Sequence, residues 1–224
     1  MALQQYLMMA NRSAAGRTLK TGALYEMGVN WTGQLGNGDT VNHPFDPVQV
    51  LGGTDWQNTT HMNDNRQVLS VKADGTLWSW GNGDNGALGH GNTSHYSTPT
   101  QVGSDTDWAN AVVTGSAMSS AIKTNGTLWT WGWNADGQLG HGDTTNRTTP
   151  AQVGSLTDWY ATIPHDNATL YWLKTDGTIW LCGQRYGLAD VSTPIQLGSD
   201  TDWTDAWQGY ASTTYNQNMF LMKA

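Results

Sequence analysis

The chain has 224 residues, a formal net charge of −8 and only 12% charged residues. Ten Lys and Arg are too few for the basic surface that binds a phosphate backbone, which excludes nucleic acid as an expected partner. One cysteine excludes an intramolecular disulfide, and 17 of the 18 acidic residues are Asp, which favours turns over helices. With 27 Gly and 13 Trp, this composition predicts an all-β chain.

The N-terminal stretch, residues 1–20, contains no apolar run of signal-peptide type. No window of the sequence approaches the roughly 18 apolar residues of a membrane span. We therefore expect a soluble chain made without a signal peptide and with no membrane partner.

Lysine marks an internal repeat, because all five lysines fall at one repeat position, with steps of 52, 51, 51 and 49 residues. Asp-Trp pairs and Pro-x-Gln motifs recur with the same period. The markers are Lys20, Lys72, Lys123, Lys174 and Lys223; Trp56, Trp108, Trp159 and Trp203; and Pro47, Pro99, Pro150 and Pro194. The chain is therefore a tandem array of units.

Turn signals divide each unit into four extended segments, called a to d. Segment a begins at the Trp after Asp, and segment b ends at the lysine. A turn such as Ala73-Asp74-Gly75-Thr76 supplies the positive φ angles of a tight hairpin that leads into segment c. Segment c, for example Leu77-Trp78-Ser79-Trp80, is apolar on both sides and indicates a strand buried on both faces. Segment d opens with proline, which suits the first residue of an edge strand.

Four short strands per unit of about 51 residues predict an all-β chain folded as a β-propeller. We expect one domain over residues 1–224, forming a small ring or an open arc. Its full units are residues 5–53, 56–103, 108–154 and 159–198, and residues 203–224 form a half unit of segments a and b. A β-sandwich is the competing fold, but it has no reason to repeat its sequence at a fixed period.

A Gly-x-Leu-Gly-x-Gly box follows segment c in three consecutive units, at residues 33–38, 86–91 and 137–142. These units resemble repeats of the regulator of chromosome condensation family, from about Gln5 to the C-terminus. The resemblance implies a β-propeller. Members include a nucleotide-exchange factor, ubiquitin-ligase subunits, a photoreceptor and a β-lactamase inhibitor, so the resemblance does not select a function.

The last part of the chain departs from the repeat pattern. The c–d connection of the fourth unit is shortened to residues 184–188, and segments a and b stand alone at the end. Unpaired sheet edges are templates for association. We therefore predict that the leftover strands or the irregular last unit contact another chain.

Four tryptophans, Trp31, Trp133, Trp172 and Trp207, break the period and are candidates for exposed recognition, whereas the periodic tryptophans are expected in the core. Together with polar neighbours and the shortened connection they predict a binding surface. The candidate residues are Asn30, Trp31, Trp133, Asn134, Asp136, Arg185, Tyr186 and Trp207.

Neither a metal site nor a cofactor is expected. His90 and His141 share one repeat position but lack further ligands nearby, so loop roles are favoured over zinc or copper. The Asp- and Asn-rich turns lack the acidic closing ligand of a calcium loop. The five periodic lysines could form a ring around an opening of the fold and attract an anion. We favour a role in protecting or solvating sheet edges.

No enzyme motif is present: there is no nucleophile elbow and no phosphate-binding loop, and Cys182 replaces a core Trp. The sequence therefore predicts a non-enzymatic protein-binding or structural subunit of a larger assembly, with self-association as the expected contact. A bacteriophage particle, as a tail, fibre or decoration protein, would suit the composition. The alternatives are a soluble regulator of one globular protein and a glycan-binding lectin.

Overall fold

The computed structural model describes residues 22–61, 66–114, 117–163, 168–184, 189–208 and 219–223. Sixteen strands and one 3-10 turn, η1 (Asp84–Gly86), occur in these residues, which confirms the all-β prediction. The strands are β1 (Tyr25–Gly28), β2 (His43–Gln49), β3 (Trp56–His61), β4 (Gln67–Lys72), β5 (Leu77–Gly81), β6 (Tyr96–Gln101), β7 (Trp108–Thr114), β8 (Met118–Lys123), β9 (Leu128–Gly132), β10 (Arg147–Gln152), β11 (Trp159–Ile163), β12 (Thr169–Lys174), β13 (Ile179–Gly183), β14 (Val191–Gln196), β15 (Trp203–Gln208) and β16 (Met219–Lys223).

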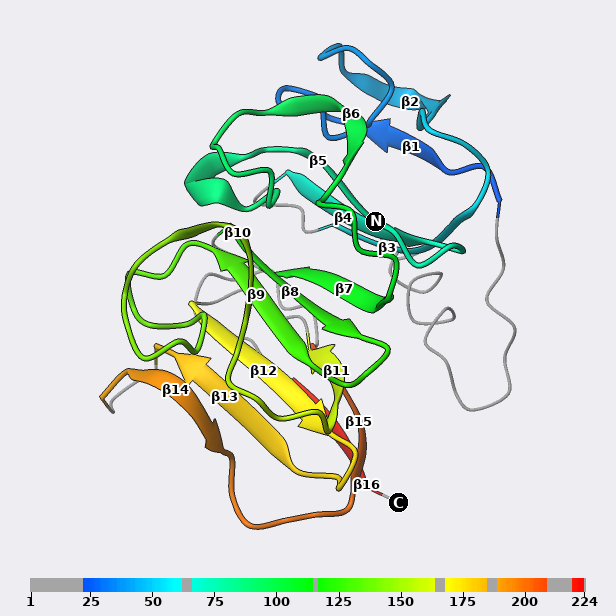
Figure 1. Cartoon of the computed structure of the whole chain (residues 1–224). Helices are drawn as coiled ribbons and strands as arrows, with labels where there is room; N and C mark the ends of the chain where they lie inside the picture. The colour runs from blue at the N-terminus through cyan, green and yellow to red at the C-terminus, as the bar shows by residue number, and fades with distance from the viewer. Residues whose placement is uncertain are drawn as a thin grey trace.

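Three antiparallel four-stranded sheets form the middle of the structure, with orders β3-β4-β5-β6, β7-β8-β9-β10 and β11-β12-β13-β14. Each contains the predicted segments a to d in sequence order. Strand β7 contacts both β3 and β11, and β11 contacts β15, so segment a strands adjoin one another. Figure 1 shows the sheets following one another, with β1–β2 at one end and β15–β16 at the other.

The predicted b–c hairpins are present, and the glycine in each has the positive φ. Gly75 has φ +78°, and its N–H donates to the Lys72 carbonyl at 3.0 Å. Asp74 does not have a positive φ, and its carboxylate accepts a hydrogen bond from the Thr76 N–H. A Cβ on Gly75 would lie 2.1 Å from the Thr106 carbonyl oxygen. The turn therefore needs glycine both for its conformation and because the next unit lies against it.

Segment c is buried on both faces, as predicted, and segment d forms the edge strand. The position predicted for proline was wrong. Pro99, Pro150 and Pro194 are each the fourth residue of their strands, where the pairing with segment c shifts register. A proline without an N–H is tolerated there because the bulge interrupts the hydrogen-bond ladder.

The glycine box joins each unit to the next. Gly86 has φ +81°, and a Cβ on it would lie 2.6 Å from the Cα of Thr148 in β10. The Gly91 N–H donates to the Thr148 carbonyl at 2.8 Å, and Leu88 between them is 1% exposed. The indole of Trp131 donates to the Ala87 carbonyl at 2.9 Å. The c–d loop of one sheet is thus fixed against the following sheet.

The fourth unit repacks its core around a smaller side chain. Cys182 takes the position of Trp80 and Trp131 and is fully buried, and burial raises the pKa of its thiol. Trp172 is also fully buried, and its indole donates to the Ser120 hydroxyl at 3.0 Å. The expectation that Trp172 is exposed was wrong, because this off-period tryptophan belongs to the same apolar cluster as Cys182.

Two-stranded sheets stand at the two ends: β1–β2, which are segments c and d, and β15–β16, which are segments a and b. The predicted segments a and b of the first unit lie outside the described residues. The division into four full units and a half therefore stays a prediction.

Candidate interaction surfaces

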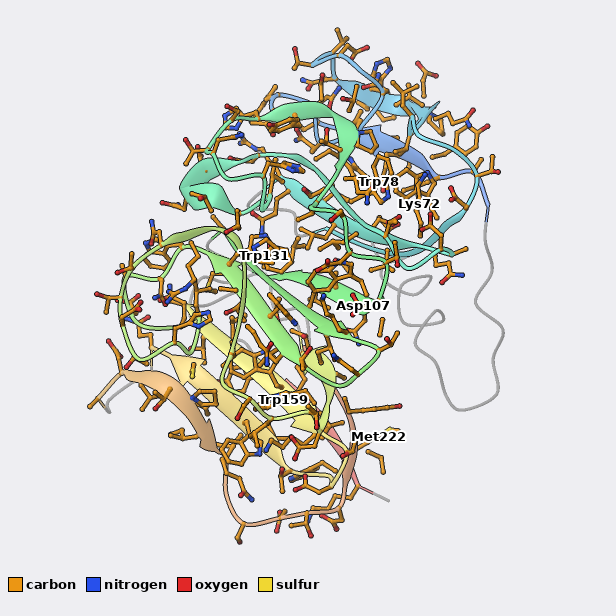
Figure 2. The ribbon with its side chains drawn as sticks, viewed as in Figure 1. Lys72, Trp78, Asp107, Trp131, Trp159 and Met222 are labelled. Carbon is orange, nitrogen blue, oxygen red and sulfur yellow. The ribbon has the colours of Figure 1, made fainter. Side chains whose placement is uncertain are left out.

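Each complete sheet holds its repeat lysine in an aromatic clamp. The Nζ of Lys72 lies 4.6 Å from the ring centroid of Trp56 and 4.4 Å from that of Trp78. Figure 2 shows Lys72 beside Trp78. The same clamp holds Lys123 between Trp108 and Trp129, and Lys174 between Trp159 and Trp180, at 4.4–4.9 Å.

Aspartates that precede segment a close these clamps. Lys123 pairs with Asp105 at 2.6 Å and Asp107 at 2.9 Å, and Lys174 pairs with Asp158 at 3.2 Å. Burial opposes the charge of Lys123, but hydrogen bonds to the two carboxylates outweigh it and raise its pKa. The three clamped lysines are only 6–8% exposed. The predicted edge-protecting or solvating role is therefore wrong for them, and their charges are not available to an anion.

Asn30 and Asn134, two predicted binding residues, shape the c–d loops from inside. Both are fully buried. The side-chain amide of Asn134 donates to the Asp143 carbonyl and carboxylate and to the Thr145 carbonyl, and its Oδ1 accepts from the Leu139 N–H. Asn30 makes the corresponding bonds within its own loop. These two side chains hold the loops and are not presented on the surface.

The remaining loop candidates differ in exposure. Trp31 is 59% exposed, and the Arg66 guanidinium lies 4.4 Å from its ring centroid. Trp133 is half-buried and packs on the apolar cluster between the β7–β10 and β11–β14 sheets. Asp136 is half-buried, and its N–H donates to the side chain of Gln138. Of the two tryptophans, Trp31 is the more exposed.

Three further predicted site residues belong to the end of the chain. Arg185 and Tyr186 lie outside the described residues. Trp207 lies in β15 opposite Phe220 of β16, and only its backbone is described.

Exposed apolar side chains are concentrated in the first described sheet and its loops. Seven of the eleven exposed large apolar residues in the described chain lie between residues 25 and 51, and we call them the first-sheet surface. Its members are Tyr25, Met27, Val29, Trp31, Val41, Phe45 and Leu51, with exposed fractions from 44% to 87%. Sequence reasoning found only Trp31. Tyr25 and Met27 could have been found, because they occupy the repeat positions of Trp78 and the fully buried Trp80.

His90 and His141 are hydrogen-bonded to strand c. The Nε2 of His141 lies 2.9 Å from the Thr130 hydroxyl, which itself donates to the Leu139 carbonyl. Burial, assisted by the Arg147 charge, lowers the pKa of His141 to about 4, and burial lowers that of His90. Both rings are therefore neutral at pH 7 and fix the loop to its strand.

A cleft of about 480 Å³ lies between the β3–β6 sheet and the β7–β10 sheet, with His90, Asp105, Trp108 and Trp129 in its wall. In the described part of the chain, no three His, Cys, Asp or Glu side chains gather as a metal site would require. No helix within those residues is long and apolar enough to cross a membrane.

Successive four-stranded sheets with adjoining segment a strands and interlocking loops define a β-propeller repeat protein. Residues 74–122 and 125–161 match the family model described as "Regulator of chromosome condensation (RCC1) repeat". These two stretches are RCC1 repeats, as the glycine box indicated.

Proteins similar in sequence include a ubiquitin ligase and an RCC1 domain-containing protein. The E3 ubiquitin-protein ligase HERC2 of Mus musculus is 30% identical over 138 residues, which cover 60% of this chain and 3% of HERC2. The mitochondrial RCC1 domain-containing protein RUG3 of Arabidopsis thaliana is 31% identical over 148 residues, covering 65% of this chain and 33% of RUG3. The chain thus spans a third or less of these relatives.

Solved structures support the fold. Human WBSCR16 has a TM-score of 0.69 at 20% identity, covering 83% of this chain and 51% of its own. Prp20p of Saccharomyces cerevisiae, described with its binding properties to Gsp1p and histones, has a TM-score of 0.63 at 17% identity, covering 84% and 48%. These likenesses establish the propeller fold and no more.

Proposed function

We propose that the chain is a non-enzymatic protein-binding module that works as a subunit of a larger assembly, and that the first-sheet surface is its contact with another chain. The observation that carries the proposal is the exposure of Tyr25 and Met27, which are 55% and 50% exposed. At the matching positions of β5, the rings of Trp78 and Trp80 are packed in an apolar cluster. Exposed apolar surface of this kind marks interaction sites.

The chemistry of the first-sheet surface suits a protein partner. Phe45 is 87% exposed, and Trp31 carries a guanidinium on its face, so an apolar contact and a cationic group stand near each other. Aromatic and arginine side chains are enriched among the residues that dominate protein interfaces. The binding of Gsp1p and histones by Prp20p, a protein of the same fold, adds support for a protein partner.

Self-association is the partner that we propose first. Light scattering over a range of concentrations should show a defined oligomer, and Phe45→Ser should shift it towards monomer. Tyr160→Ser is the matched control, because Tyr160 is 52% exposed on β11, away from the first-sheet surface. A monomer at every concentration would refute self-association and favour a regulator of one globular protein.

The bacteriophage setting rests on composition alone and stays a prediction. Glycan binding also stays a prediction, and a glycan array with Trp133→Ala as the comparison would test it.

A further inference from the structure

The cleft of about 480 Å³ lies between two four-stranded sheets in the middle of the array, β3–β6 and β7–β10 (Figure 1). Its wall consists of residues 89–90, 101–105, 108, 129 and 149–150, all of which the structure describes. Sites for small molecules are commonly clefts of about 300–1,000 Å³ with apolar walls and a few polar groups. The size and the wall of this cleft therefore suit a small-molecule ligand.

Polar side chains on the wall of the cleft can both donate and accept hydrogen bonds. The side chain of Asp105 is 51% exposed, and its carboxylate accepts. Gln101 is half-buried and Ser104 is exposed, and the amide of the first and the hydroxyl of the second each donate and accept. Such groups suit a ligand that carries several hydroxyls.

His90 adds an acceptor whose state is defined by its neighbours. Its Nε2 lies 2.9 Å from the Ser79 hydroxyl, whose single hydrogen is donated to the Leu88 carbonyl at 2.6 Å. The hydroxyl oxygen therefore accepts from the Nε2–H, and Nδ1 of the neutral ring keeps its lone pair. Burial lowers the pKa of His90, which keeps the ring neutral at pH 7.

The apolar part of the wall is the half-buried indole of Trp129, together with the half-buried Pro150. The Trp129 indole N–H donates to the Thr127 hydroxyl at 3.0 Å, so its one polar atom is already paired. Trp108 packs against this indole edge-on, with the ring centroids 5.9 Å apart. The indole is therefore a fixed apolar surface, which suits the C–H face of a pyranose ring.

The charges at the cleft favour a neutral ligand. Lys123 is buried and already paired with both Asp105 and Asp107. An ammonium ligand would have to compete with Lys123 for the Asp105 carboxylate, and an anion would lie beside that exposed carboxylate. A neutral ligand with hydroxyls meets neither penalty.

We propose that this cleft binds a neutral saccharide, with a hexopyranose ring against Trp129 and its hydroxyls hydrogen-bonded to Asp105 and Gln101. None of the residues in the wall belongs to the first-sheet surface. The saccharide site therefore goes beyond the proposed function and does not depend on it.

The next pair of sheets identifies Asp105 as the residue to change. At the corresponding positions between β7–β10 and β11–β14, the chain keeps the histidine, glutamine, serine and tryptophan but has Leu156 in place of Asp105. Lys174 is held there by Asp158, the counterpart of Asp107. A clamp can therefore form without the carboxylate of Asp105, which leaves that carboxylate for the ligand.

Saturation-transfer difference NMR on the full chain tests the proposal with the neutral disaccharides cellobiose, maltose, lactose and N,N′-diacetylchitobiose. We expect saturable transfer to at least one of them, with a dissociation constant that rises about tenfold in Asp105→Leu, because a hydrogen bond to a carboxylate is lost. Asp200→Leu is the matched control. Asp200 occupies the same repeat position, is 50% exposed and pairs with Lys223 at 3.0 Å, but it lies outside the wall of the cleft.

Three results would overturn the proposal: no saturable transfer to any of the disaccharides, an unchanged dissociation constant in Asp105→Leu, or equal weakening by Asp105→Leu and Asp200→Leu. The cationic probe N-acetyl-lysine methylamide provides a further test. Transfer to this probe and to none of the disaccharides would show a cation site instead. Circular dichroism of each variant separates lost binding from lost folding.

Discussion

Lys123→Met tests whether the clamps stabilise the propeller. The substitution keeps most of the aliphatic stem but removes two cation–π contacts, worth about 1 kcal/mol each at a largely buried site. It also removes ion pairs to Asp105 and Asp107, whose side chains are about half exposed, so each pair is worth about 0.5 kcal/mol. We expect the free energy of unfolding to fall by about 3 kcal/mol in urea denaturation.

Lys223→Met provides the comparison. Among the described residues Lys223 lies over one ring, that of Trp203, and its side chain is 42% exposed, so we expect a much smaller loss. The pKa of Lys123 is raised in the folded chain, so the stability that its charge contributes is fully present below pH 10.5. That contribution is lost as the pH rises through the folded pKa, a loss that Lys123→Met should not show. A loss below about 1 kcal/mol for Lys123→Met, or equal losses in the two variants, would refute the reasoning.

Three further predictions concern the loops and turns. Asn134→Ala leaves buried backbone groups without partners and should lower the free energy of unfolding by about 2–3 kcal/mol in urea denaturation. Because the folded pKa of His141 is lowered from 6.5 to about 4, stability should fall as the pH drops through that window, by about 1–2 kcal/mol for a half-buried ring; His141→Gln should flatten this part of a pH–stability curve. Gly126→Ala should lower the melting temperature by more than 5 °C, because its Cβ would lie 2.0 Å from the Thr157 carbonyl oxygen and its φ is +77°; an unchanged melting temperature would contradict the role given to this turn.

The first-sheet surface shows that the position of a residue in the repeat does not by itself predict its burial. Comparison of the units placed Trp31 off the period and marked it for recognition, and the structure shows it exposed. The same comparison could have marked Tyr25 and Met27, which occupy periodic positions but are exposed in the first described sheet. Position in the repeat predicts burial only where a neighbouring unit supplies the packing surface.

Off-period tryptophans were an unreliable signal for exposure. Trp172 breaks the period as Trp31 does, yet it is fully buried in the cluster that contains Cys182. A large residue at one position and a small one at another keep the core filled, and such compensation between strands is invisible in a single repeat alignment.

The sequence by itself determined the repeat, the four segments of each unit, the hairpin turns and the buried strand c, because each depends on local chemistry that recurs with the period. Its glycine box also indicated the RCC1 repeat that the family model matches over residues 74–122 and 125–161. Only the tertiary structure decided what the periodic lysines do, because their two tryptophans and their aspartates come from different segments and meet only when the sheet forms. It likewise decided that Asn30 and Asn134 are internal loop supports, since that role depends on which backbone groups the folded loop turns inward.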